Sequence, residues 1–269
     1  VHKEGDTELV CERNISVKKL PVSKVNQSKI SYSCGAGKAE VNVYTGRMIF
    51  ESPDISIGEN SYATGISHVY DHHTAPFTTS KFGNRWKLNI EQSLEICADN
   101  TAKYSDSYGY IHTFEKYDTT DGYDKYFDQG GLGLTLFVGE DVYIEDEQNG
   151  KTFFTSINGT YRAKKIVSGV HDDIAKIIEY DTDSKIKEYY DERKPERKFV
   201  LEYSGDRLAQ ISCEANATTV IYRYDDNGNL IFVRKQVGQN EKHGAYYVYS
   251  GENLTYAIDL ENGSSIKFE

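Results

Sequence analysis

Apolar and polar residues alternate with a period of two along most of the chain from residue 39 onward, which is typical of half-buried β-strands. The clearest case is the segment 220–233. Apolar and aromatic side chains share one face in 220–224 and again after residue 230, and the turn between them contains Asn227 and Gly228. Both residue types tolerate positive φ, so the segment predicts a β-hairpin with a tight or bulged turn.

The same alternation predicts a series of further strands. Asn149 and Gly150 mark another hairpin, and 86–96 fits one long strand with a local irregularity near 91–93. We expect 108–114 and 131–138 to be partners in one meander, joined by an Asp- and Tyr-rich loop. The remaining expected strands are 30–32, 41–44, 48–50, 55–57, 63–70, 143–145, 152–156, 174–181 and 265–268.

A unit made of a tyrosine, a short turn and an aliphatic residue recurs along the second half of the chain, with its tyrosines roughly two dozen residues apart. One hairpin cannot bury its own apolar face in water, so such units must stack. The alternative is an ordinary β-rich domain with several good turns. The residues that define the unit are Tyr180, Asp181, Tyr203, Gly205, Leu208, Tyr224, Asp225, Gly228, Leu230, Tyr249, Gly251 and Leu254.

The first unit departs from the pattern, because Ser184 stands where glycine would be. The segment that follows it, 185–193, is rich in Lys and Glu and is the only stretch with helical character, which Pro195 would end. We favour a strand there, because Ile186 occupies the aliphatic position after the turn.

These units resemble the YD repeats of the RHS family, which also occur in the BC component of insecticidal Tc toxins and in teneurins. The unit at Tyr224 is the best match. A second, independent resemblance lies upstream, where a Thr-Gly strand, an Ile-Ser-Ile strand, a Tyr strand and a turn before Trp follow one another as at the start of RHS shells. These motifs occupy 41–47, 54–57, 68–71 and 82–86, and the two resemblances together cover 39–269.

The resemblance implies an all-β fold in which antiparallel hairpins stack into a curved, partly wound sheet. It divides the chain into a polar lead-in at 1–38, an RHS-like N-terminal β region at 39–168 and YD-repeat hairpins at 169–269. The implied function is that of a non-catalytic structural segment of a shell, which encloses or presents a polypeptide cargo such as a toxin. The implied partners are the rest of the shell and its cargo, and the implied location is secreted or on a bacterial cell surface.

The family's self-cleaving core motif includes Asp-Pro pairs, and this chain contains none. We therefore expect no catalytic residue, and we expect no cofactor and no metal. The chain begins at Val1 without a signal-like segment, so we expect it to be a trimmed or excised piece of a longer protein.

Composition changes the picture in a few respects. Tyrosine occurs 22 times against a single Trp and a single Met, which suits sheets with one face toward water. The net charge of −11 repels phosphate backbones, so no nucleic-acid partner is expected, and no apolar run approaches membrane-spanning length. The four cysteines lack metal-ligand spacing; a disulfide between Cys11 and Cys34 and buried thiols are the alternatives.

Polar clusters that could carry chemistry each have a plainer explanation. Residues 71–73 include an Asp and two His, but neighbouring strand residues face opposite sides, which favours a solvated loop; the same holds for 171–173. Residues 145–147 are acidic but match no calcium-loop spacing, so they indicate a hairpin rim. The glycines in 130–133 lack the Lys and the helix of a phosphate loop.

Two other functions remain as hypotheses. A secreted or cell-surface binding module would engage glycans or a surface protein through exposed aromatic residues. A hydrolase with an unrecognised site is the weaker hypothesis, because no nucleophile motif surrounds any Ser or Cys. A Ser/His pair or clustered carboxylates in one cleft would support it. The candidate aromatic residues of the binding module are Tyr108, Tyr110, Tyr123 and Tyr126.

Overall fold

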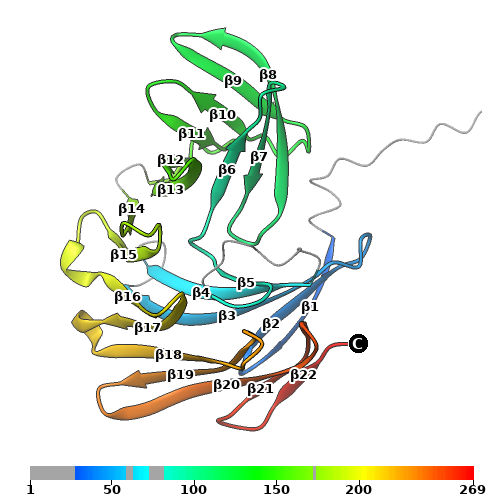
Figure 1. The fold of residues 1–269 in the computed structure, drawn as a ribbon, viewed down its shortest axis with the longest axis vertical. Coiled ribbons are helices and arrows are strands. Elements are labelled where there is room, and N and C mark those ends of the chain that lie inside the picture. The colour runs from blue at the N-terminus through cyan, green and yellow to red at the C-terminus, as the bar shows by residue number, and fades with distance from the viewer. Residues whose placement is uncertain (1–27, 59–62, 73–81, 172–173) are drawn as a thin grey trace, which may run out of the picture.

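Three groups of antiparallel strands follow one another along the chain (Figure 1). The computed structural model describes residues 28–58, 63–72, 82–171 and 174–269. These residues form 22 β-strands and two short 3₁₀ helices, η2 (Pro195–Arg197) and η3 (Glu214–Asn216). The expected all-β fold is therefore confirmed. The Cys11 alternative lies outside the described residues, and Cys34 is a free thiol.

The first group is a five-stranded sheet whose strands pair in chain order. It contains the expected segments 48–50, 55–57 and 63–70, and the first two are halves of one strand that bulges between Pro53 and Ile55. Its strands are β1 (Lys29–Cys34), β2 (Gly37–Asn42), β3 (Met48–Ile57), β4 (Thr64–Asp71) and β5 (Trp86–Leu88).

The second group is a closed barrel of eight strands, which forms the upper lobe in Figure 1. It closes where the start of the last strand pairs with the first, through Tyr161 opposite Leu94. Inward-pointing side chains such as Phe114 and Leu136 are fully buried, so the barrel interior is packed. The strands are β6 (Ser93–Ile96), β7 (Thr101–Ser105), β8 (Ile111–Thr120), β9 (Tyr123–Asp128), β10 (Thr135–Val138), β11 (Val142–Glu145), β12 (Lys151–Ile157) and β13 (Thr160–Val167).

Two expectations about this region are wrong. The segment 86–96 is not one strand, because β5 belongs to the five-stranded sheet and β6 to the barrel. The loop expected between 108–114 and 131–138 is instead the β8–β9 ribbon, so β9 lies between β8 and β10. The hairpin predicted at Asn149 and Gly150 is confirmed by the pairing of β11 with β12.

The third group is an open sheet that continues from the barrel, because the end of β13 pairs with its first strand. Each strand then pairs with the next in chain order. The segment 185–193 contains a strand, as favoured, and the hairpin around Gly228 joins β18 to β19. The strands are β14 (Ala175–Tyr180), β15 (Ile186–Asp191), β16 (Phe199–Ser204), β17 (Arg207–Cys213), β18 (Thr218–Tyr224), β19 (Leu230–Val237), β20 (Asn240–Ser250), β21 (Asn253–Asp259) and β22 (Ser265–Lys267).

The five-stranded sheet packs against one face of β18–β22 (Figure 1). Phe50 meets both Tyr247 and Phe268 edge to face, at centroid distances of 5.9 and 5.8 Å. Phe82 meets Tyr222 at 4.8 Å. Aromatic side chains from the first sheet and from the segment before β5 therefore cover this face of the hairpins.

Candidate functional site

The recurring tyrosine has the same backbone setting in every unit. Each one lies directly opposite the aliphatic residue that follows its turn, and a register shift separates it from the residue before it. Such a shift is a β-bulge, and its extra residue lies on the strand after the turn, directly after the aliphatic residue, where it increases the local twist. The four pairs are Tyr180 with Ile186, Tyr203 with Leu208, Tyr224 with Leu230, and Tyr249 with Leu254.

The hydroxyl groups of these tyrosines form a ladder from one unit to the next. Tyr203 donates to the carbonyl of Ile186 at 3.0 Å and Tyr224 to that of Leu208 at 2.9 Å. Tyr249 continues the series to the carbonyl of Leu230 at 2.5 Å. In each case the acceptor is the aliphatic residue of the preceding unit. Every tyrosine therefore ties its own hairpin to its neighbour.

The first rung ties the repeats to the barrel, because Tyr180 donates to the carbonyl of Ala163 on β13 at 2.8 Å. Burial raises the pKa of Tyr180, Tyr203, Tyr224 and Tyr249, since the phenolate would lose its hydration. These groups are structural donors that hold their protons far above neutral pH.

Side chains in the turns satisfy their own backbone. Asp225 Oδ1 accepts from the Asn229 amide at 2.8 Å, and Asp181 Oδ1 accepts from the Lys185 amide at 2.9 Å. Ser184 lies in the left-handed region at φ 63°, where Gly228 lies in its own unit at φ 84°. The Asp and the glycine position therefore have turn-forming roles, as the repeated pattern indicated.

A buried polar network joins the five-stranded sheet to the repeats. His68 lies 2.8 Å from Asp54 Oδ1 through Nδ1 and 2.7 Å from the Tyr247 hydroxyl through Nε2. Trp86 Nε1 donates to the Tyr249 hydroxyl at 2.8 Å, so that hydroxyl takes part in both the ladder and the interface. His68 and Asp54 are almost completely buried, so the network specifies how the sheets fit together and no substrate reaches it.

The four tyrosines suggested for surface binding do not form one site. Tyr108 and Tyr110 lie in the β7–β8 turn, where Lys29 Nζ is 5.8 and 5.7 Å from their ring centroids. Arg47 stacks on Tyr110 at 3.9 Å and so helps to dock the barrel onto the first sheet. Tyr126 is 4% exposed inside the barrel, which excludes it from a surface site. Tyr123 lies on the outer wall of the barrel.

Tyr123 belongs to a row of aromatic side chains that crosses four strands of the barrel's outer wall. Phe137, Tyr143 and Phe153 lie directly opposite one another on β10, β11 and β12, so they share a face. The Phe137 and Tyr143 rings stack at 4.7 Å, and Tyr123 meets Tyr143 edge to face at 5.9 Å. In the sequence, the sign of this row is an apolar residue that stands beside a buried apolar residue on the same strand and therefore points to the opposite face.

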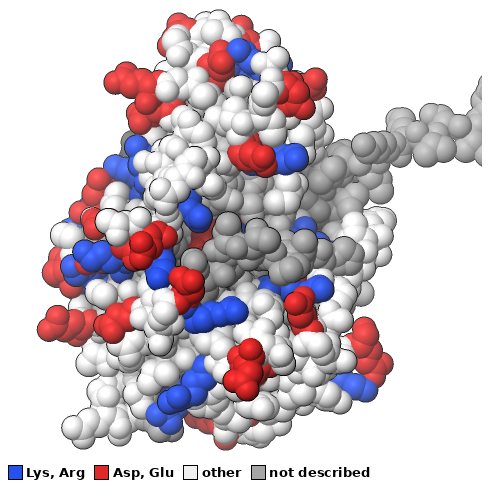
Figure 2. Space-filling view, in the orientation of Figure 1, with Lys and Arg blue, Asp and Glu red and all other residues white. Residues whose placement is uncertain are grey.

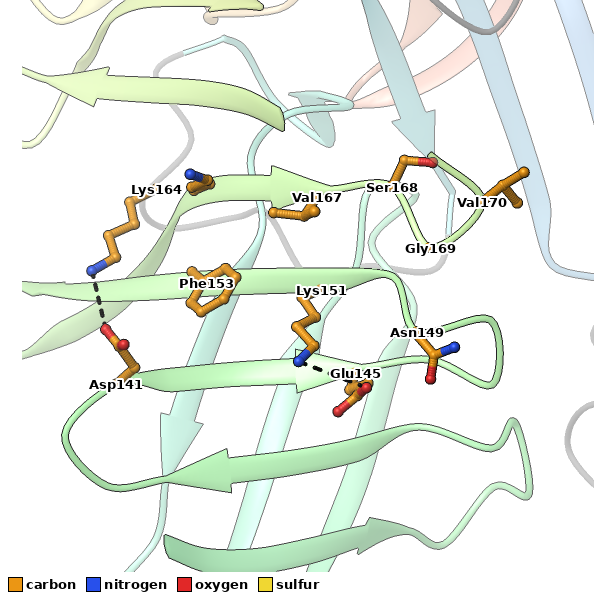
Figure 3. Close-up of a pocket in the computed structure, with 11 residues that line it drawn as sticks. Asp141, Glu145, Asn149, Lys151, Phe153, Lys164, Val167, Ser168, Gly169 and Val170 are labelled. Atoms are coloured by element: carbon orange, nitrogen blue, oxygen red, sulfur yellow. Dashed lines mark ion pairs between the residues drawn. The ribbon is translucent and has the colours of Figure 1, made fainter. Parts of the chain in front are cut away.

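A groove adjoins the row at Phe153 (Figure 3). Its volume is about 950 Å³, and Phe153, Val167 and Val170 supply its apolar surface. Lys164 pairs with Asp141 at 3.7 Å on one side, and Lys151 pairs with Glu145 at 3.8 Å on another (Figure 3). Paired charges beside apolar side chains suit a neutral, polar ligand better than an ion.

A second cavity, of about 470 Å³, opens at the mouth of the barrel. His112 and Ser168 both line it, but they are held by different partners. His112 Nε2 lies 2.9 Å from Asp106, whereas Ser168 Oγ accepts from the His171 amide at 3.2 Å. A nucleophile and its base require a mutual hydrogen bond, which these contacts do not provide.

The other polar clusters have structural partners. Asp71 pairs with Arg47, through a hydrogen bond of 3.1 Å from Nε and a second from a terminal nitrogen. The loop at 130–133 is fastened by Asp128, whose carboxylate accepts from the amides of Gly130 and Leu132. Residues 73 and 172–173 lie outside the described residues. Among the residues that the structure describes, no group of three or more His, Cys, Asp or Glu is arranged to hold a metal ion.

Over the face seen in Figure 2, the described acidic and basic side chains are interspersed, and acidic ones gather on the turns of the barrel lobe. No helix in the described part of the chain is long and apolar enough to cross a membrane. No protein-family model matches this chain, and no curated protein matches its sequence.

Proposed function

We propose that this chain is a non-catalytic structural segment of a YD-repeat shell, which encloses or presents a polypeptide cargo. The tyrosine ladder carries the proposal, because one contact recurs between successive hairpins and extends the sheet by the same step. A contact that repeats in this way suits a shell wall to which further hairpins are added one after another. The resemblance to RHS shells adds the cargo and the secreted or cell-surface location.

Within such a shell, this chain would form a closed end. A wall that faces a lumen leaves its inner surface free for the cargo. Here aromatic residues from the first sheet cover the inner surface of β18–β22, with Phe50 and Trp86 completely buried. The cargo would therefore lie beyond the segment, against later hairpins.

A non-catalytic role agrees with the burial of the histidine that links an aspartate to a tyrosine. His68 has an aspartate and a tyrosine as partners, but its side chain is 1% exposed. The same groups form the hydrogen bonds that hold the two sheets together, so they have a structural role.

The test uses the complete product of the gene that encodes this chain. If the shell encloses cargo, the segment beyond the repeats should resist added protease and become sensitive once the shell is unfolded by denaturant. The same segment produced alone serves as the matched control. Digestion of the two at the same rate would contradict the proposal.

The groove on the barrel favours a second candidate function, a module that binds neutral glycans. Its aromatic side chain and paired charges offer stacking and hydrogen bonds to a sugar. On a glycan array, Phe153→Ala should abolish any hit, while Tyr246→Ala on the exposed face of the repeats should not. Equal signals from both variants, or no hit at all, would contradict this candidate.

A further inference from the structure

The first sheet extends beyond the sheet that covers it. Ala39 lies opposite the fully buried Phe50, so the face they share is the inner, core-facing one. Val41 is on the same face of β2, and Ile30 and Tyr32 lie opposite Val41 and Ala39 on β1. Yet Ile30 is 67% exposed, Tyr32 62% and Val41 39%. The apolar inner face therefore continues past the edge of its cover.

The edge of the cover is β22, which pairs with β21. Within the described residues the only strand that pairs with β22 is β21, and the only one that pairs with β1 is β2. The two edges lie together on one side of the molecule (Figure 1), and the Gly35 amide donates to Ser264 Oγ at 3.4 Å between them. The uncovered apolar residues and an open hydrogen-bonding edge thus belong to one surface.

The repeat register defines what β22 would continue into. Successive hairpins pair in the same register. The residue three positions after the aliphatic residue of one unit lies directly opposite the residue four positions before the ladder tyrosine of the next unit. Ala257 and Ile266 form the same pair after Leu254, and Phe268 follows two residues later as Tyr222 follows Val220. The earlier pairs are Tyr189 with Phe199, Ile211 with Val220, and Val233 with Ala245.

The position two residues after Phe268 is therefore the place of a ladder tyrosine. Its acceptor would be the carbonyl of Leu254, as Leu230 serves Tyr249 and Leu208 serves Tyr224. Phe268 already occupies the equivalent of Tyr247, because both rings meet Phe50. The side chains along β22 are therefore placed for one particular register of the next strand.

We propose that β22 is the first strand of one further hairpin of the tyrosine-and-turn kind, and that its free edge and the exposed inner face of β1–β2 form a docking surface for the turn and second strand of that hairpin. The tyrosine would follow β22 and donate to the carbonyl of Leu254, and the second strand would add to the β22 edge and lay its apolar face over Ile30, Tyr32 and Val41. This rests on the proposed function, because a growing wall supplies such a hairpin. In this proposal the first sheet is the surface on which the next strand of the shell packs.

The test extends the full chain with a copy of residues 224–237, which hold a ladder tyrosine, its turn and the second strand of the hairpin, joined directly after Glu269. The copied tyrosine then falls two residues after Phe268. We expect at least tenfold slower hydrogen exchange of the backbone amides in 265–269 and a severalfold drop in oxidative labelling of Tyr32. A matched control inserts one glycine after Glu269, which moves every side chain of the copy to the opposite face, and it should leave both readouts unchanged.

Equal protection by the two extensions, or by neither, would overturn the proposal. A dimer of the unextended chain with a protected β22 would overturn it in favour of a second copy as the occupant. Protection in the unextended chain that disappears on removal of residues 1–27 would overturn it in favour of that segment. Each of these results leaves the cargo-protection assay unaffected, so failure here is distinguishable from failure of the proposed function.

Discussion

The ladder tyrosines show how one side chain serves two elements. Each ladder tyrosine lies opposite the aliphatic residue of its own hairpin, and its hydroxyl donates to a backbone carbonyl of the preceding hairpin. Phenylalanine would fill the same volume without donating. Tyrosine at this position is thus explained by a hydrogen bond as well as by burial.

Tyr224→Phe isolates that hydrogen bond. It removes the donor to Leu208 and leaves the carbonyl without this partner, so the free energy of unfolding should fall by about 1–2 kcal/mol. Urea denaturation measures the change. Tyr246→Phe, on a side chain that is 40% exposed, is the control and should stay within about 0.5 kcal/mol of the parent protein. Equal effects would mean that the rung contributes nothing.

The turns fix the hairpins as elements. Asp225 Oδ1 accepts from the Asn229 amide and Oδ2 from the Asn229 side chain, so a single carboxylate orders both the backbone and the side chain of the residue before Leu230. The hairpin register depends on this turn, because the strands on either side could otherwise slip by one residue and turn their apolar faces outward.

Asp225→Ala should therefore destabilise the protein by about 1–2 kcal/mol and raise hydrogen exchange in β18 and β19 before it does so in the barrel. Its neighbour Asp226 is exposed, so Asp226→Ala is the matched control and should be close to neutral. Hydrogen exchange measured by mass spectrometry gives both readouts. If exchange rises first in the barrel, the turn does not have the role assigned to it.

Elements that depend on short-range patterns were predictable from the sequence, and elements that depend on distant partners were not. The hairpin at Gly228 follows from a turn and two alternating flanks. The β8–β9 ribbon was missed because 115–120 is polar apart from Tyr117, so alternation disappears where a strand extends into solvent. The split of 86–96 was missed because both halves alternate correctly, and only tertiary structure assigns Trp86 to one sheet and Leu94 to another.

In the candidate sites, the unit residues were found and their contacts were not. Turn chemistry identifies Asp225 and Gly228, whereas the acceptor of Tyr224 lies sixteen residues away on β17 and depends on the pairing of β17 with β18. The surface tyrosines failed as a set because sequence does not say which face of a barrel strand looks inward, as Tyr126 shows.

The whole molecule should be sensitive to alkali. Burial raises the pKa of the ladder tyrosines, and it does the same for Tyr222 and Tyr247 at the sheet interface. The unfolded chain releases these phenolic protons near pH 10, whereas the folded chain retains them. The stabilisation is therefore complete below pH 10 and is lost as the pH rises further.

The free energy of unfolding should fall above pH 10 by about 1.4 kcal/mol per pH unit for each such tyrosine. Lys87 opposes this, because burial lowers its pKa to about 8, from 10.5, and the unfolded chain binds the extra proton between those values. One lysine is outweighed by several tyrosines. Urea titrations at a series of pH values, with phenolate absorbance recorded alongside, measure the slope, and Tyr224→Phe should reduce it by one tyrosine's share. A slope that Tyr224→Phe leaves unchanged would contradict the assignment.

The account depends on the first sheet and the repeats forming one packed body, and Trp86 reports on their interface directly. It is the only tryptophan of the chain, it is fully buried, and it donates to Tyr249. The measurement is a denaturant titration that follows Trp86 emission together with hydrogen-exchange protection of β18–β21. We predict a single shared midpoint. A red shift of Trp86 emission while β18–β21 remain protected would mean that the inner face of the repeats stands without its cover, which contradicts the account.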